Sequence, residues 1–480
     1  MIELSTKISD YLRELFDEEY AKKYTDYTKT DFVTYLRFPS WEKNHDEIIN
    51  SLKRYGIQLE VVENIPYAYR VVEGYDKVGK TVEHTLGRYY IQSLSSMIPP
   101  FVLNPNKEDV TLDLCAAPGS KTTQLAELMN NRGTLVANEP SNKRIRSLVF
   151  NADRLNLVNL GVIRYKGESL SKVYDHHFDK ILVDAPCSGL GIVQKKGEIS
   201  NWWNTEQVRI LSELQLRLLI SAIKMAKVGA EILYSTCTIT FEENEYVIDK
   251  VLGKYPVELE TVELPVPSHE GLTECYGDKF SPELKKTRRI LPWEINSEGF
   301  FIAKLRKTGP TDIPSKEVLK KDDIRFIPAG NKFVKKYIHD LSEYYGIEYS
   351  VLDEFQYRIK THDVYFINKE WSMNALGIYE RLGIKFGKVD KNDYIVLHTH
   401  AARVLGNRIT KNVIDLSGEE LNVYMQGGTV KKECDLLGQK VVRYEGNVIG
   451  TAVATQSGLK SQFPRSLRTQ EIILPDDLKQ

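Results

Sequence analysis

The feature that most constrains the fold is a repeated alternation of apolar runs and helical patterns between residues 111 and 236. Apolar runs typical of buried strands begin at Thr111 and recur at 133–139, 162–166, 180–185 and 230–236, and amphipathic helical patterns follow from about Lys121 and at 141–155 and 205–226. Such alternation predicts an α/β fold with a mostly parallel, doubly wound sheet. In these sheets ligands bind beyond the carboxyl ends of the strands.

The first predicted strand runs into a glycine-containing loop and then into a helix. The loop consists of Cys115, Ala116, Ala117, Pro118, Gly119, Ser120 and Lys121. It matches neither G-x-G-x-x-G nor the phosphate-binding G-x-x-x-x-G-K-[ST] pattern, so we expect a compact ligand to lie on it. Glu139 ends the next strand, where a carboxylate can accept hydrogen bonds from ribose hydroxyls. Either feature alone fits an ordinary turn or a solvated side chain, but together they favour a nucleoside-bearing cofactor.

Two cysteines follow two strands of this predicted sheet. The motif DAPCSG leads from Asp184 to Cys187 through a proline and a glycine, which predicts a tight loop, and ILYSTC ends at Cys237. Because parallel strands end on one edge of a sheet, we expect both thiols to lie beside the cofactor loop. A helix is expected to begin at Thr240, since Glu243 follows in the spacing of a capping box.

The cysteine pattern, the N-terminal residues and the net charge limit the kinds of protein this chain can be. The five cysteines are odd in number and contain no C-x-x-C pair, which argues against a metal site or a disulfide framework and predicts free thiols in a reducing compartment. Cys275 and Cys434 have no motif around them, and we expect them to be structural. The N-terminal stretch lacks the basic start and apolar run of a signal peptide, so we expect a cytoplasmic protein with no membrane partner. A net charge of −1 gives no global sign of nucleic-acid binding.

Four motifs occur in order along the chain: DLCAAPGSKT at 113–122, DAPCSG at 184–189, STCT at 235–238 and EENE at 242–245. As a set they resemble the NOL/NOP/SUN family of S-adenosylmethionine-dependent RNA cytosine-5 methyltransferases. The resemblance extends over residues 30–307, and residues 437–468 are similar to the PUA-like tail of bacterial members that modify small-subunit ribosomal RNA. Where the family usually has an Asp after the third strand, this chain has Lys166 or Glu168, so no third cofactor contact is predicted there.

The resemblance implies a Rossmann-like class I methyltransferase core. It also implies S-adenosyl-L-methionine as the cofactor, bound by residues 115–121, Glu139 and Asp184, with Cys237 as the nucleophile and Cys187 assisting product release. The chemistry needs a thiol, because C5 of cytosine becomes nucleophilic enough to take a methyl group only after a thiolate has added at C6. We expect Asp184 to hydrogen-bond the base and the positive charge of Lys121 to favour the thiolate.

Other functions would carry other motifs. DNA cytosine-5 methyltransferases use the Pro-Cys cysteine as nucleophile and do not need the Thr-Cys of STCT, so RNA is favoured over DNA. Exocyclic amino methyltransferases would have D/N-P-P-Y/F where this chain has DAPC. A non-catalytic RNA-binding scaffold would be indicated by a lost thiol, and both thiols are present. The PUA-like tail makes 16S ribosomal RNA the first expected partner and transfer RNA the alternative.

We expect four segments in a monomeric chain. Residues 1–80 are expected to form a small α+β RNA-binding domain, 81–307 the methyltransferase core, 308–395 a linker and an intermediate domain, and 396–480 a β-rich PUA-like RNA-binding domain.

Overall fold

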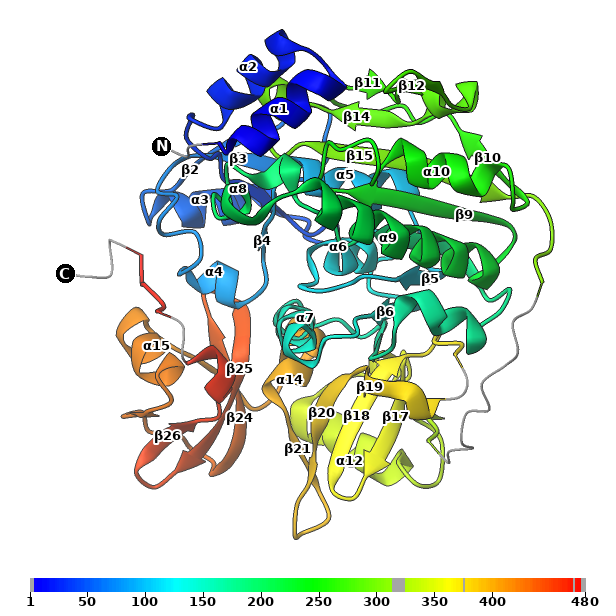
Figure 1. Cartoon of the computed structure of the whole chain (residues 1–480). Helices are drawn as coiled ribbons and strands as arrows, with labels where there is room; N and C mark the ends of the chain where they lie inside the picture. Colours follow the sequence, from blue (N-terminus) through cyan, green and yellow to red (C-terminus); the bar gives the residue numbers. More distant parts are fainter. Residues whose placement is uncertain (1–3, 313–323, 374–375, 469–470, 476–480) are drawn as a thin grey trace.

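The computed structural model of the chain describes residues 4–312, 324–373, 376–468 and 471–475. Residues 313–316 of the expected linker KTGPTDIPSK lie outside this part. A large sheet occupies the middle of the molecule, with the N-terminal helices on one side of it and the C-terminal segments on the opposite side (Figure 1). Within the described ranges, no helix is long and apolar enough to cross a membrane.

The large sheet confirms the expected α/β core, but as a whole it is mixed rather than mostly parallel, because antiparallel strands flank its parallel centre. It contains β5 (Val110–Asp113), β6 (Thr134–Asn138), β7 (Leu160–Ile163), β8 (Phe178–Asp184), β9 (Ala226–Thr236), β10 (Val257–Glu260), β11 (His269–Glu270), β14 (Arg288–Ile290), β15 (Phe300–Lys307) and β19 (Tyr379–Leu382). The order is β11-β14-β15-β9-β8-β5-β6-β7-β19, and β10 pairs with β15. Strands β5 to β9 are parallel to one another. The chain order reverses at β5, which lies between β6 and β8, and doubly wound sheets bind ligands at such a position.

Helices cover both faces of the sheet because its side chains alternate. They are α5 (Leu94–Leu103), α6 (Ser120–Leu128), α7 (Asn142–Arg154), α9 (Thr205–Met225) and α10 (Glu245–Leu252). Val136 packs with α9 and α10 on one face. Its neighbours Leu135 and Ala137 pack with α5, α6 and α7 on the other. Strands buried on both faces give the near-continuous apolar runs seen in the sequence.

Two local predictions differ from the structure. Strand β7 lies two residues earlier than the expected 162–166, because the apolar Leu160–Ile163 is buried whereas Arg164 pairs with the exposed side chain of Glu380. The helix expected to begin at Thr240 begins at Glu245 instead. There is no capping box here, since Thr240 donates its hydroxyl to the Glu243 carboxylate at 2.9 Å before the helix starts.

The N-terminal region forms a second sheet with the order β2-β3-β1-β4. Its elements are β1 (Tyr35–Arg37), β2 (Gln58–Val61), β3 (Ala68–Glu73) and β4 (Tyr90–Ile91), with α1 (Thr6–Leu15), α2 (Glu18–Tyr27), α3 (His45–Lys53) and α4 (Val82–Thr85). The α+β character is as expected. The expected boundary at residue 80 falls inside this sheet, because β4 pairs with β1.

Two further sheets follow the core. The first contains β16 (Ile327–Pro328), β17 (Phe355–Lys360), β18 (Asp363–Asn368), β20 (Ile384–Val389) and β21 (Ile395–Leu397), with α12 (Lys335–Tyr345) and α13 (Tyr349–Leu352). The second contains β22 (Val413–Asp415), β23 (Thr429–Val430), β24 (Gly438–Tyr444), β25 (Asn447–Thr455) and β26 (Gly458–Ser461), with α14 (Thr399–Leu405) and α15 (Gly418–Met425). The expected boundary between residues 395 and 396 falls within β21.

Strand β19 connects this later part of the chain to the core. It pairs antiparallel with β7, bringing Tyr379 opposite Ile163. A side chain at Gly161 would collide with the Tyr379 ring, since a Cβ there would lie 2.5 Å from it. Arg381 also forms an ion pair with Asp153 at 2.6 Å. The edge of the large sheet is therefore completed by a strand from within residues 308–395, which the sequence predicts to form a linker and a separate domain.

Candidate active site

The carboxyl ends of β5, β6, β8 and β9 open into one pocket of about 480 Å³. Of the site residues expected from the sequence, it is lined by Cys115, Ala117, Pro118, Glu139, Asp184, Cys187 and Cys237. The other expected residues, Ala116, Gly119, Ser120 and Lys121, do not line it. The structure thus brings the expected cofactor loop and both thiols to a single cavity.

The loop after β5 is held by side chains beneath it. Gly119 adopts φ = +109°, a conformation that favours glycine, and a Cβ there would lie 3.0 Å from Leu148. Thr122 donates its hydroxyl to the Asp113 carboxylate at 2.7 Å, and Asn151 donates to the Pro118 carbonyl at 2.9 Å. The loop is therefore fixed between β5 and α7.

Glu139 is buried at the end of β6, and its carboxylate already has partners. Oε1 accepts the backbone N–H of Ser141 at 2.8 Å, and Oε2 forms an ion pair with Arg144 at 3.0 Å. Each carboxylate oxygen has a second acceptor position, so the group can still receive a hydroxyl from a ligand. Arg144 also lines the pocket and was not anticipated from the sequence, because a basic residue in the first turn of a helix gives no distinct signal.

Lys121 and Asp184 form a pair at the carboxyl end of β8. The ammonium donates to Asp184 Oδ2 at 2.8 Å, and Ser235 donates its hydroxyl to Oδ1 at 2.9 Å. Burial lowers the pKa of Lys121, but the attraction of Asp184 outweighs it and leaves the pKa above its ordinary value. Cys237 contributes to the same upward shift of the Lys121 pKa. The lysine is thus a permanent positive charge that interacts with both the aspartate and the thiol.

The two thiols meet as the sequence predicts. Cys187 Sγ lies 3.0 Å from Cys237 Sγ, and both side chains are half-buried. The hydrogen bond with Cys237 and burial raise the pKa of Cys187 well above its ordinary value. At neutral pH Cys187 is therefore a neutral thiol that can donate its proton to the other sulfur.

Glu243 anchors the DAPCSG loop, a role that was not anticipated. Its carboxylate accepts the backbone N–H of Ser188 at 2.8 Å and also the Ser188 hydroxyl. Gln215 of α9 donates to the same carboxylate at 2.9 Å. The next residue, Asn244, donates to the Thr238 carbonyl at 3.1 Å. The EENE motif therefore holds both cysteine loops, and its presence in the sequence was the available signal.

Other residues singled out in the sequence differ in whether they reach the pocket. Glu168 lines the pocket whereas Lys166 does not. Trp202 of α8 (Ile199–Trp202) also lines the pocket and is 40% exposed. Cys275 is buried and Cys434 is half-buried, and neither lines this pocket.

Comparisons with known proteins agree with this arrangement. Residues 100–306 match the model of the 16S rRNA methyltransferase RsmB/F family, and residues 411–469 match the methyltransferase RsmF PUA domain. The ribosomal RNA small subunit methyltransferase F of Aliivibrio fischeri is 32% identical over 82% of this chain and 81% of its own length. The tRNA (cytosine(49)-C(5))-methyltransferase of Pyrococcus abyssi is 41% identical over 49% of this chain and 76% of its own length.

A solved structure gives the same result for the fold. A methyltransferase homolog from Pyrococcus horikoshii superimposes with a TM-score of 0.57 at 30% identity, covering 64% of this chain and 96% of that one.

Proposed function

Because this chain belongs to the 16S rRNA methyltransferase RsmB/F family, we propose that it methylates C5 of a cytosine in RNA, with 16S ribosomal RNA as its substrate. The observation that carries the proposal is the pair of thiols 3.0 Å apart beside Asp184, in the pocket that also holds the loop after β5. A methyltransferase acting on an exocyclic amine needs no such pair. The match of residues 411–469 to the RsmF PUA domain supports ribosomal over transfer RNA.

S-adenosylmethionine is the proposed cofactor, and the residues present fit it. The cavity of about 480 Å³ is large enough for a nucleoside-sized ligand, and Glu139 retains acceptor positions for ribose hydroxyls. We propose that the loop 115–121 holds the cofactor through its pocket-lining residues Cys115, Ala117 and Pro118, together with Glu139 and Asp184. When bound, it supplies the methyl group.

The chain's own residues supply covalent catalysis. The Cys237 thiolate adds to C6 of the cytosine, so that an S–C6 bond forms and the C5–C6 double-bond electrons make C5 nucleophilic. As this adduct forms, N3 of the base takes a proton from solvent, and Asp184 accepts a hydrogen bond from that N3–H or from the amino group of the base. A base from solvent then removes the proton from the methylated C5, and the electron pair of that C–H bond restores the C5–C6 double bond. The S–C6 bond breaks at the same time and releases the Cys237 thiolate, and N3 returns its proton to solvent. Cys187 donates a hydrogen bond to the departing thiolate, and Lys121 supplies positive charge to it.

Two measurements test the function. Titration calorimetry with S-adenosylmethionine should give one binding site per chain, and no heat of binding would refute the cofactor assignment. Sequencing of 5-methylcytosine in RNA from cells lacking the protein should show the loss of one or more modified positions in 16S ribosomal RNA. Loss confined to transfer RNA would favour the alternative suggested by the Pyrococcus abyssi relative.

We also propose that the terminal regions bind the RNA in the cytoplasm. The PUA-like segment presents the exposed side chains of Lys460 and Arg465, which lie in the basic stretch LKSQFPRSLR. Positive side chains of this kind neutralise phosphates and position a nucleic acid without reading its sequence.

A further inference from the structure

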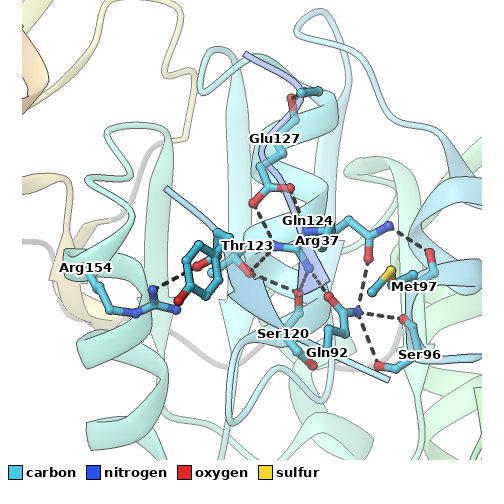
Figure 2. Close-up of polar contacts among 11 residues, drawn as sticks. Arg37, Gln92, Ser96, Met97, Ser120, Thr123, Gln124, Glu127 and Arg154 are labelled. Carbon is cyan, nitrogen blue, oxygen red and sulfur yellow. Dashed lines mark hydrogen bonds and ion pairs between the residues drawn. The ribbon is translucent and has the colours of Figure 1, made fainter. Parts of the chain in front are cut away.

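A buried polar network connects the N-terminal sheet to α6, the helix that follows the candidate cofactor loop (Figure 2). Its centre is Arg37, the last residue of β1, whose side chain is only 3% exposed. Its guanidinium donates from Nε and Nη2 to the two carboxylate oxygens of Glu127, each at 2.7 Å. This forked geometry fixes direction as well as distance.

The same guanidinium reaches the first turn of α6. Arg37 Nη1 donates to the Ser120 carbonyl at 3.0 Å, and Nη2 donates to Thr123 Oγ1 at 3.0 Å. Ser120 begins the helix directly after Gly119 and stands next to Lys121. One side chain of the N-terminal sheet therefore holds the point at which the loop becomes a helix.

Two glutamines extend the network to α5. Gln92 accepts a hydrogen bond from Arg37 and donates to the Ser96 carbonyl at 2.9 Å and to Gln124 at 3.1 Å. Gln124 in turn donates to the Met97 carbonyl at 2.8 Å. Both glutamines are buried, so their orientations are set by these bonds alone.

The network also contains buried charged groups that pack around an aromatic ring. The Tyr90 ring lies between two guanidinium groups, with Arg37 Cζ 5.1 Å and Arg154 Cζ 5.2 Å from its centroid. Burial raises the pKa of Glu127 although Arg37 opposes the shift. A buried ion pair often contributes no more stability than apolar side chains of the same volume would. The value of the Arg37–Glu127 pair is therefore geometric, because its forked contacts fix the position of α6 relative to β1.

We propose that Arg37 is a positioning residue of the cofactor site, which fixes the start of α6 and thereby the loop Cys115–Gly119 and the Lys121–Asp184 pair. The inference rests on the proposed function of this loop as the S-adenosylmethionine site. A displacement on the order of 1 Å in a binding or reacting group can cost roughly 100-fold in rate, so a small rotation of α6 has a measurable effect.

The test is Arg37→Lys, which keeps the charge but cannot form the forked contacts. We expect the Kd for S-adenosylmethionine to rise roughly tenfold, with the KM for RNA unchanged, at a temperature where circular dichroism shows a folded protein. The matched control is Arg88→Lys. Arg88 also pairs with two carboxylates, those of Glu42 and Glu47. Neither of these partners lies in α6.

The outcomes separate the two proposals. A wild-type Kd for folded Arg37→Lys overturns the inference, and so does an equal weakening in Arg88→Lys, which would indicate general loosening of the N-terminal region. Wild-type protein that binds no S-adenosylmethionine overturns both the inference and the proposed function. If Arg37→Lys does not fold, Glu127→Gln replaces it. That variant retains one carbonyl acceptor but loses the ion pair, and its Kd should rise roughly tenfold because a charged hydrogen bond is lost; an unchanged Kd refutes the inference.

Discussion

Removing either thiol should stop the reaction at a different step. In Cys237→Ala no S–C6 bond can form, so no covalent complex with RNA should appear. In Cys187→Ala the attack and the methyl transfer remain, but the departing sulfur loses the donor that lies 3.0 Å away. This variant should therefore accumulate a covalent protein–RNA complex.

The structure sets the size of the effect. A hydrogen bond to a charged group contributes about 1.5–3 kcal/mol, which corresponds to a release step slower by roughly 10- to 150-fold. The effect should stay local, because the loop is anchored one residue later, where Ser188 donates its backbone N–H to Glu243 at 2.8 Å. The unfolding temperature of Cys187→Ala should therefore remain close to that of the wild type.

The assay is denaturing gel electrophoresis after incubation with labelled substrate RNA and S-adenosylmethionine. Cys187→Ala should give a shifted band that survives detergent, and wild type should give little of it. Cys434→Ala is the matched control, because that half-buried thiol does not line the pocket. A band in Cys237→Ala and none in Cys187→Ala would reverse the two roles and refute this mechanism.

Three further changes test other parts of the molecule. Asp184→Asn keeps the shape of the side chain but removes its charge, so kcat should fall by about 100-fold or more while RNA binding is retained, and an unchanged kcat in steady-state assays would exclude Asp184 from the chemistry. Lys460→Ala with Arg465→Ala should raise the KM for RNA several-fold and flatten its dependence on salt, with kcat unchanged; an unaltered salt slope would remove this surface from RNA binding. Gly161→Val should lower the free energy of unfolding by about 1–3 kcal/mol in urea titrations because Tyr379 must move, and wild-type stability would mean that β19 is dispensable.

The sequence correctly predicted the features that depend on local residue patterns and on the direction of the strands. Parallel strands end on one edge, and this rule alone brought Cys187, Cys237 and the loop after β5 to one pocket. Periodicity also located α9 and α7 to within a residue or two of their observed ends. These features depend on residues close together in the chain or on one general rule of sheet geometry.

The missed features depend on contacts between distant segments. Arg37 stands in YLRFPS, where it looks like an outward-facing strand residue, and its burial depends on Glu127, which is 90 residues away. Nothing in a single sequence indicates that pairing. The helix expected at Thr240 failed for a related reason, because the hydroxyl and Glu243 are drawn into anchoring the Ser188 loop instead of capping a helix.

The pairing of β7 with β19 has a consequence for how the chain is made. Arg164 and Glu380, which meet across this edge, are 216 residues apart. At a synthesis rate of roughly 5–20 residues per second, β7 leaves the ribosome about 10–40 s before its partner strand exists. During that time the backbone groups along the outer edge of β7 have no strand to bond and can pair with another nascent chain. Folding of this enzyme in the cell is thus exposed to edge-to-edge aggregation until residue 382 has been synthesised, and chaperones that shield strand edges should raise its yield.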